Sequence, residues 1–413
     1  MRDGWITVDR GRVAAVTKRA PANGGQQIDL GEVAVLPGLV NAHTHLELAY
    51  LRHEVPPAAE FVTWIRAVIA ARRRRPDPQS PEILDAVERA LAEAAACGTA
   101  IVGDISNTLV SFAPLTRSAL GGVVFYELIR FHVADPQTFV EEAWAEVNRL
   151  VPTDRVRASL AAHAPYSVAP LVFRAIRQAI NRDPFVPSSV HLAESAEELE
   201  FIRHGRGPWR ELLEDLGVWD PAWVPPGGSP VQFLDDSGFL DARVLAVHGV
   251  KADAQDLARL AKRGTTLVTC PRSNDYTGAG APPIRNFYTS GVRVAVGTDS
   301  LASAPDLNLF SELVRMRELA PDVPAATLLD SATRQGARAL GFDADYGTIE
   351  PGKRARLLAV EIPPLTIDVE EYLVPKNKSV LELEINLRRG RAGNPAENCT
   401  RILSQKRHGG EIA

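Results

Sequence analysis

Apolar, β-branched runs alternate with amphipathic stretches from about residue 35 to residue 300. Stretches with helical spacing, such as PEILDAVERALAEAAA and PQTFVEEAWAEVNRL, lie between these runs. Continuous apolar runs separated by helices are typical of repeated βα units around a parallel sheet. The eight runs are VLPGLVNAH (35–43), TAIVGDI (99–105), GVVFYEL (122–128), VRASLAAH (156–163), FVPSSVHL (185–192), RVLAVHG (243–249), TTLVTC (265–270) and VRVAVGTD (292–299). Eight strands, mostly followed by a helix, predict a (β/α)₈ barrel; an open doubly wound sheet is the alternative, for which eight strands would be many.

The segments on both sides of this repeat indicate a second, smaller unit. Residues 1–36 contain short strand-like runs around turns, and further short runs follow two helical stretches near the other end. We therefore expect residues 1–36 and 345–390 to form a small β-sandwich, and residues 37–344 to form the barrel. Residues 391–413 are polar and weakly periodic, and they receive no assignment. The stretch 206–230, which contains three tryptophans, either forms a wall of the pocket or packs on the surface.

Composition and charge exclude several classes of protein. The net charge of −5 shows no basic excess, so we expect no nucleic-acid partner. The one basic run, Arg72 to Arg75, precedes Pro76 and is interpreted as a solvated helix end. Three cysteines without paired spacing argue against disulfides and a cysteine-based zinc site. With no signal-like start and no run of about 18 apolar residues, the chain is expected to be cytoplasmic and to have no membrane partner.

Five of the eight runs end in a residue that can bind a metal or transfer a proton. In a (β/α)₈ barrel the C-terminal ends of all strands meet at one mouth. Residues two apart on a strand face the same side, so His43 and His45 can reach one ion. A lone histidine at a strand end would more often be structural, but five of the nine histidines lie at such ends. The residues are His43, His45, His163, His191 (with Glu194 three positions later), His248 and Asp299.

Six motifs, PGLVNAHTHLE, HAPYS, HLAES, VHG, CPRSN and GTDS, resemble in order and spacing the amidohydrolase superfamily. Within it they are similar to the aminohydrolases that deaminate adenosine-like nucleosides and related ring amines. The resemblance spans about residues 30–355 and implies one divalent metal, Zn²⁺ first and Fe²⁺ as the alternative. Relatives with two metals bridge them with a carboxylated lysine on strand four, and VRASLAAHAP has no lysine. The ligands that the resemblance implies are His43, His45, His191 and Asp299.

The resemblance also implies the reaction. Three imidazoles and a carboxylate suit Zn²⁺ and leave a position for water, whose pKa the metal lowers. The resulting hydroxide is expected to attack an amino-substituted purine ring and release ammonia. Glu194 would protonate the ring nitrogen, His248 would orient the hydroxide, and Asp299 would take the proton of the water.

Five further residues are candidate substrate contacts, each with a plainer alternative. His163 is expected at the substrate, against a buried structural role. Glu47 would bond a ribose hydroxyl or simply begin a helix, and Arg130 would bind an anionic or hydroxyl-bearing group or form a surface salt bridge. Arg272 and Asn274, in CPRSN, would line the pocket or shape a turn.

Among the possible substrates, the motifs most resemble the aminofutalosine deaminases, which act on an adenine ring with a carboxylated 5′ substituent on a route to menaquinone. Deaminases of S-adenosylhomocysteine, methylthioadenosine or 5′-deoxyadenosine are the first alternative, followed by guanine or cytosine deaminases and triazine hydrolases. A catalytically silent scaffold is the non-enzyme alternative, and it is disfavoured because every ligand and acid–base residue is present. Related barrels are often dimers, which leaves a homodimer open.

Overall fold

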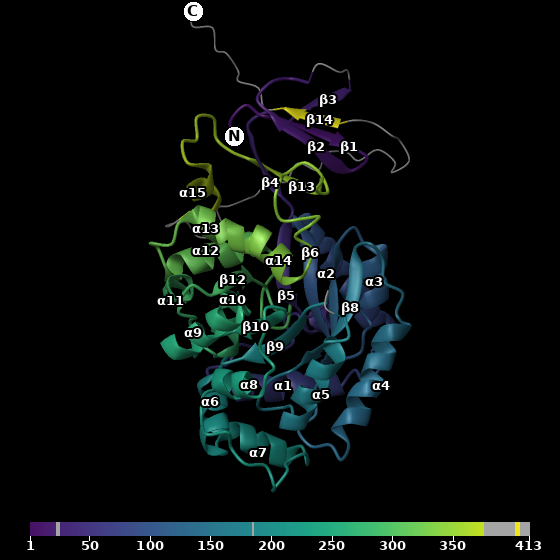
Figure 1. Cartoon of the computed structure of the whole chain (residues 1–413), viewed down its shortest axis with the longest axis vertical. Coiled ribbons are helices and arrows are strands. Elements are labelled where there is room, and N and C mark those ends of the chain that lie inside the picture. Colours follow the sequence, from purple (N-terminus) through teal and green to yellow (C-terminus); the bar gives the residue numbers. More distant parts are fainter. Residues whose placement is uncertain (22–24, 184–185, 376–400, 405–413) are drawn as a thin grey trace, which may run out of the picture.

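The computed structural model describes residues 1–21, 25–183 and 186–375, together with the backbone of 401–404. Its larger part contains eight parallel strands, one at each of the apolar runs (Figure 1). They pair in two sets of four, in the orders β5-β6-β7-β8 and β9-β10-β11-β12. The strands are β5 (Leu39–Thr44), β6 (Thr99–Ser106), β7 (Gly121–Leu128), β8 (Val156–Ala162), β9 (Ser188–Leu192), β10 (Val244–His248), β11 (Thr266–Thr269) and β12 (Arg293–Val296).

Hydrogen bonds join the two sets at both seams. Beside β8 and β9, the backbone N–H of His191 donates to the carbonyl of His163 at 2.8 Å. Beside β12 and β5, the backbone N–H groups of Thr298 and Asp299 both donate to the carbonyl of His43, each at 3.1 Å. The strands therefore succeed one another around a closed ring, and the prediction of a (β/α)₈ barrel is confirmed.

Helices cover the outside of this ring, and several begin where the sequence provides a start signal. Proline occupies the first turn of α2, α4, α5, α7, α8 and α10, where its missing N–H has no intrahelical partner to lose. Among the described residues, no helix combines the length and apolar character that a bilayer crossing needs. The helices are α1 (Phe61–Arg73), α2 (Pro81–Ala96), α3 (Phe112–Arg117), α4 (Pro136–Arg149), α5 (Pro170–Ile180), α6 (Ala196–His204), α7 (Pro208–Asp215), α8 (Pro230–Asp236), α9 (Ala254–Arg263), α10 (Pro271–Thr277), α11 (Ile284–Thr289), α12 (Leu309–Leu319), α13 (Ala325–Asp330), α14 (Gly336–Ala339) and α15 (Val369–Leu373), with a 3-10 helix at Leu46–Leu51 and a π-helical turn at Ser331–Gln335.

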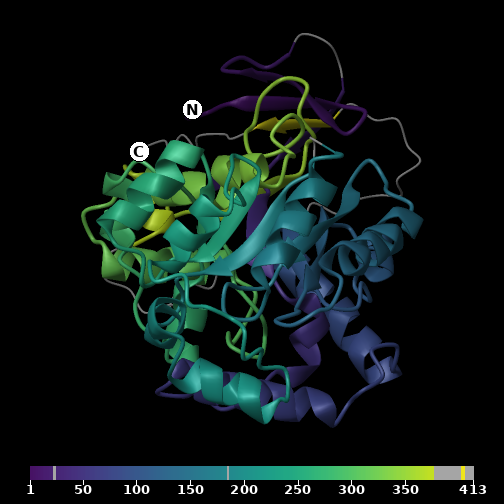
Figure 2. The ribbon, with the colours of Figure 1, turned by 60° about the horizontal axis from the view of Figure 1, so that its bottom comes forward.

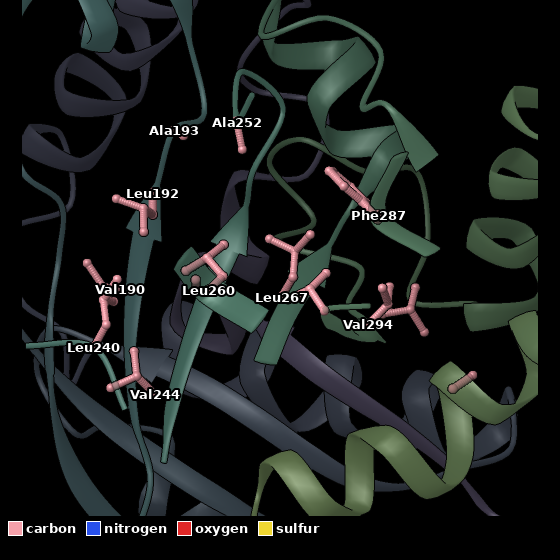
Figure 3. Packing of buried hydrophobic residues seen from close by; sticks show 14 of the residues in the cluster. Val190, Leu192, Ala193, Leu240, Val244, Ala252, Leu260, Leu267, Phe287 and Val294 are labelled. Atoms are coloured by element: carbon pink, nitrogen blue, oxygen red, sulfur yellow. The ribbon is translucent and has the colours of Figure 1, made fainter. Parts of the chain in front are cut away.

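The strands are buried on both faces, as their continuous apolar runs predict. On β10, Val244 and Ala246 belong to the core between strands and helices, whereas Leu245 and Val247 belong to the core inside the barrel. Figure 3 shows the outer core, where side chains of β9 to β12 meet those of the covering helices. Burying one such side chain contributes about 1.5–3 kcal/mol. Because each strand packs on both faces, the directions in which the side chains at its C-terminal end point are fixed.

A smaller unit of short strands lies where β5 begins, at the end of the barrel opposite α7 (Figures 1 and 2). It holds a four-stranded sheet in the order β2-β1-β14-β3, and a separate antiparallel pair of β4 and β13. These strands are β1 (Trp5–Asp9), β2 (Arg12–Thr17), β3 (Gln26–Asp29), β4 (Val33–Pro37), β13 (Leu357–Glu361) and β14 (Arg401–Ser404).

The C-terminal contribution to this unit differs from the expectation. Strand β13 comes from the expected range of 345–390, but β14 comes from the tail that received no assignment. Four residues within a polar sequence carry too short a pattern to predict a strand. Residues 376–390 of the expected sandwich, and most of the tail, lie outside the described residues. The domain boundaries therefore stay a prediction.

The seam between β12 and β5 leaves no room for a side chain at Gly297. A Cβ atom there would lie 2.6 Å from the carbonyl oxygen and 2.8 Å from the Cβ of His43. We expect Gly297→Ala to lower the free energy of unfolding by about 1–3 kcal/mol in urea denaturation, because the backbone must shift. The control Gly228→Ala meets only the flexible end of Gln232, at 2.7 Å, and should change stability by less than about 0.5 kcal/mol. Equal stability of the two variants would contradict a close seam.

Candidate active site

The residues expected to bind a metal converge at the C-terminal ends of the strands. The ring centres of His43 and His45 are 4.9 Å apart, and those of His43 and His191 are 5.0 Å apart. Nε2 of His45 lies 3.5 Å from Oδ1 of Asp299. The predicted ligands, separated by up to about 250 positions in the sequence, thus form one cluster. His248 also lies in it, with its ring centre 5.3 Å from that of His191.

The chemistry of this cluster fits a divalent cation. Ligand atoms of His43, His45 and His191 lie within 4.8 Å of one another, and so do those of His43, His248 and Asp299. Both ring nitrogens of His43 are buried and have no hydrogen-bond partner. Leaving such an atom unpaired costs about 1–3 kcal/mol, which a bound cation would offset. Three imidazoles and one carboxylate form a donor set that suits Zn²⁺.

The protonation states also suit a cation. Burial lowers the pKa of His43 well below its usual range, and burial lowers the pKa of His45 to about 3. Both imidazoles are therefore neutral near pH 7, as metal ligands must be. Burial disfavours the Asp299 carboxylate, but the neighbouring His45 and His248 leave its pKa below the usual value. The Ser273 hydroxyl donates to this carboxylate at 2.6 Å and stabilises its charged form.

Hydrogen bonds from behind orient His191. Its Nδ1 lies 3.0 Å from the carbonyl of His163, which can only accept, so Nδ1 carries the proton and Nε2 is free for a metal. Glu127 lies beside this bond, with Oε1 at 3.3 Å from Nδ1. Asn107 donates to the other oxygen of Glu127 at 2.7 Å. Sequence reasoning missed Glu127, although it stands near the end of the third apolar run, where a side chain reaches the mouth.

The backbone turns sharply just before Glu194, and the side chain of a second glutamate binds the N–H groups of this turn. Ala193, just before it, has a φ of 51°, which is rare for a residue with a side chain. The buried carboxylate of Glu198 accepts the N–H of Ala193 at 3.0 Å and that of Glu194 at 2.7 Å. Burial raises the pKa of Glu194 well above its usual value, which favours the protonated carboxyl. A carboxyl group that keeps its proton near pH 7 is suited to donate it.

His248 faces Glu194, with 3.4 Å between Nε2 and Oε1. Its Nδ1 lies 2.9 Å from the amide nitrogen of Asn274. Asn274, expected to line the pocket, is fully buried and instead holds His248 from behind. His248 and Asp299 also have positive φ values, 78° and 59°. Such conformations cost about 1–3 kcal/mol each and concentrate at functional sites.

A cavity of about 320 Å³ opens beside these groups. Its walls are mostly apolar and come from α1, α7 and the loop after β7. His163 lines it as expected, and its Nδ1 lies 2.5 Å from the Ser167 hydroxyl. Trp209 and Leu213 belong to the tryptophan-rich stretch 206–230, so this stretch does form a wall of the pocket. Arg130 lines the cavity too.

Besides Asn274, two more predicted substrate contacts lie outside the cavity wall. The carboxylate of Glu47 lies at the C-terminal end of β6, where it accepts the hydroxyl of Ser106 at 2.6 Å. Arg272 is engaged with Glu312 at 2.7 Å and Asp306 at 2.9 Å. Neither Glu47 nor Arg272 is among the residues that line the cavity, so the structure gives their role as substrate contacts no support, and that role stays a prediction.

One residue that was expected in solvent lies at the cavity instead. Arg72, interpreted from the sequence as part of a solvated helix end, lines the cavity instead. The basic run carries no signal for this difference, because only the placement of α1 against the mouth turns Arg72 inward and leaves Arg73 exposed.

Residues 34–383 match the model of the amidohydrolase family. The chain belongs to this family. Aminodeoxyfutalosine deaminase of Deinococcus radiodurans is 32% identical over 321 residues, which cover 74% of this chain and 73% of that protein. A 5-methylthioadenosine/S-adenosylhomocysteine deaminase of Nitratidesulfovibrio vulgaris is 28% identical over 377 residues, 88% of this chain and 80% of that protein.

Two solved structures share the fold over most of their length. The aminofutalosine deaminase of Helicobacter pylori, in complex with methylthio-coformycin, has a TM-score of 0.77 at 26% identity. The match covers 89% of this chain and 90% of that one. An adenosine deaminase of Xanthomonas campestris with bound zinc has a TM-score of 0.76 at 27% identity, covering 91% and 84%.

The candidate metal centre can be tested without an activity assay. We expect the purified chain to bind one Zn²⁺ in equilibrium dialysis with elemental analysis. His191→Ala should weaken this binding by more than about 100-fold, beyond the roughly 10–100-fold typical of residues that only orient a ligand. The control His204→Ala, on the exposed end of α6, should bind as the unchanged chain does. Normal zinc binding by His191→Ala would contradict the assigned ligand set.

Proposed function

We propose that this protein is a metal-dependent aminohydrolase, which removes an amino group from the purine ring of a nucleoside-like small molecule and releases ammonia. The observation that supports this proposal most is the pairing of buried Glu194 with His248, 3.4 Å apart, beside a donor set for one cation. A protein that only stores metal or binds nucleotides has no use for this pair. The two deaminase relatives and the family membership support the same reaction class.

A divalent cation held by His43, His45, His191 and Asp299 would lower the pKa of a water molecule and supply a nucleophile near pH 7. Glu194 then acts on the substrate. It donates its proton to the ring nitrogen next to the carbon that bears the amino group, which makes that carbon a better electrophile. The carbon forms a bond to the oxygen of the water and loses its bond to the amino nitrogen. The departing amine takes up the proton that Asp299 accepts from the water, the added hydroxyl returns its proton to Glu194, and ammonia leaves.

His248 and Asp299 act on the water. With Nδ1 of His248 beside Asn274, Nε2 points toward Glu194 and orients the attacking oxygen. Asp299 is ionised, so its carboxylate can accept the proton that the water loses. The mostly apolar cavity walls exclude bulk water and suit the faces of a purine ring.

The same cavity favours a neutral ring over an anion near the metal site. Burial lowers the pKa of His163 to about 4, so this imidazole is neutral near pH 7 and serves as a hydrogen-bonding group. Within this class, we propose 6-amino-6-deoxyfutalosine (aminodeoxyfutalosine) as the substrate. Two observations support this choice: the similarity to the deaminase of Deinococcus radiodurans, and the cation of Arg130 on the cavity wall. Deamination of methylthioadenosine or S-adenosylhomocysteine is the alternative that the relative of Nitratidesulfovibrio vulgaris supports.

An ammonia-release assay with zinc-loaded protein tests the proposal. The panel is aminodeoxyfutalosine, adenosine, 5′-deoxyadenosine, methylthioadenosine, S-adenosylhomocysteine, guanine and cytosine. We expect the highest kcat/KM for aminodeoxyfutalosine. Equal turnover of the other nucleosides would reject this substrate and keep the reaction class, whereas no ammonia from any compound would reject the class.

Replacing Glu194 by Gln tests its role as proton donor. The amide cannot supply a proton, so we expect kcat to fall by at least about 10²–10⁴-fold, while zinc content stays the same. The control Glu200→Gln, on the exposed side of α6, should keep full kcat. A loss of zinc from Glu194→Gln would show that this residue holds the metal instead.

A further inference from the structure

A second cavity adjoins the first at the mouth of the barrel. It has a volume of about 500 Å³ and extends along α4, where Phe139 and Glu142 line it. Its walls are mostly polar, in contrast to those of the first cavity. The residues that line both cavities are Arg72, Asn107, Glu127, Ile129 and Arg130. A ligand that reaches from the candidate metal site into the second cavity must pass these two arginines.

Arg72 is held in place rather than free in solvent. Its side chain is 33% exposed, and its guanidinium donates to Oδ1 of Asn107 at 2.8 Å and to Oε1 of Glu47 at 3.1 Å. Glu47 is itself fixed, because it accepts the hydroxyls of Ser106 and Thr108 at 2.6 and 2.8 Å. A guanidinium has five N–H donors, so two such bonds leave others for the cavity. The molecule thus presents a pre-oriented cation on the cavity wall.

Arg130 supplies a second cation at the same junction. Across the described ranges, its side chain forms no ion pair, whereas Glu146 on the far wall pairs with Arg149. Its guanidinium carbon lies 4.9 Å from the ring centre of Phe139, an arrangement that supports the planar group from one face. The carboxylate of Glu127, although near, is occupied by Asn107 and His191. Glu142 is the remaining carboxylate of the second cavity, and it forms no ion pair within the part of the chain that the structure describes.

We propose that Arg72 and Arg130 form an anion subsite, which binds a carboxylate on the substrate's 5′ substituent while the purine ring occupies the first cavity. This inference rests on the proposed function and specifies how the substrate is chosen. Arginine presents paired N–H donors that match a carboxylate, and such charge-assisted bonds are stronger inside a cavity than in water. A neutral substituent would form no charge-assisted bond with these donors, so the subsite favours the carboxylated substrate over it.

The experiment compares a carboxylated and a neutral nucleoside. Wild type, Arg72→Gln and Arg130→Gln, all zinc-loaded, are assayed with aminodeoxyfutalosine, S-adenosylhomocysteine and methylthioadenosine. We expect the ratio of kcat/KM for aminodeoxyfutalosine over methylthioadenosine to fall about 10–100-fold in each variant, mainly through KM. Arg130 is exposed, so its variant tests the subsite even if Arg72→Gln folds poorly. The control Arg73→Gln removes an adjacent, exposed cation of α1 that lines neither cavity, and should leave the ratio unchanged.

S-adenosylhomocysteine shows whether the subsite binds any carboxylate on the 5′ substituent or only the carboxyaryl group of aminodeoxyfutalosine. In the arginine variants, the ratio of kcat/KM for S-adenosylhomocysteine over methylthioadenosine is compared with the same ratio for aminodeoxyfutalosine. If both ratios fall equally, the subsite binds any carboxylate at this position. If only the aminodeoxyfutalosine ratio falls, the subsite is specific for the carboxyaryl group. Both outcomes support the subsite, whereas an unchanged ratio for both compounds, or an equal loss of kcat/KM for all three, overturns it.

Calorimetric binding separates this inference from the proposed function. If wild type releases no ammonia from any nucleoside, the deaminase proposal fails, and binding alone then decides on the subsite. Wild type should bind aminodeoxyfutalosine at least about 10-fold more tightly than methylthioadenosine, and Arg130→Gln should lose this preference. The preference should also decrease at high ionic strength, because salt screens the charges. Equal affinity of wild type for both compounds would overturn the subsite.

Discussion

The carbonyl oxygen of His43 is the point on which the site depends. It accepts the N–H groups of Thr298 and Asp299, and so joins the first strand of the barrel to the segment that follows the last one. Two predicted metal ligands, far apart in the sequence, are brought together by these backbone bonds. Gly297 allows the close approach, because any side chain there would press on His43. The ligand geometry is therefore a property of barrel closure as much as of the ligands themselves.

Burial then determines what these groups can do. The imidazoles are neutral, the Asp299 carboxylate is charged and Glu194 retains its proton, although all lie within one small region. Similar side chains acquire different roles because each has different hydrogen-bond partners. Asp299 accepts bonds from Ser273 and the N–H of Ser300, which stabilise its charge. For Glu194, burial and nearby carboxylates dominate instead.

The barrel and the convergence of the candidate metal ligands could be predicted from the sequence, whereas much of the pocket wall could not. Eight apolar runs specify the strands, and barrel topology alone brings His191 and Asp299 to one mouth. The direction of a long side chain depends on contacts that the pattern does not reveal. Arg272, for example, is neutralised by partners 34 and 40 positions away, and this removes it from the cavity. Arg72 was misread for the opposite reason, since the fold of α1 directs a surface-like residue inward.

A continuous set of polar contacts connects the two ends of the pocket. Arg72 bonds Asn107, Asn107 bonds Glu127, and Glu127 lies against the Nδ1 side of His191. The group that would recognise the distal part of a ligand is thus only three contacts from a candidate metal ligand. His191 also keeps its own bond to the His163 carbonyl, so a single substitution at Arg72 should leave it in place, whereas larger changes to α1 would disturb the candidate cation site as well. Directed evolution of this scaffold would do better to begin at Arg130, which stands outside that set.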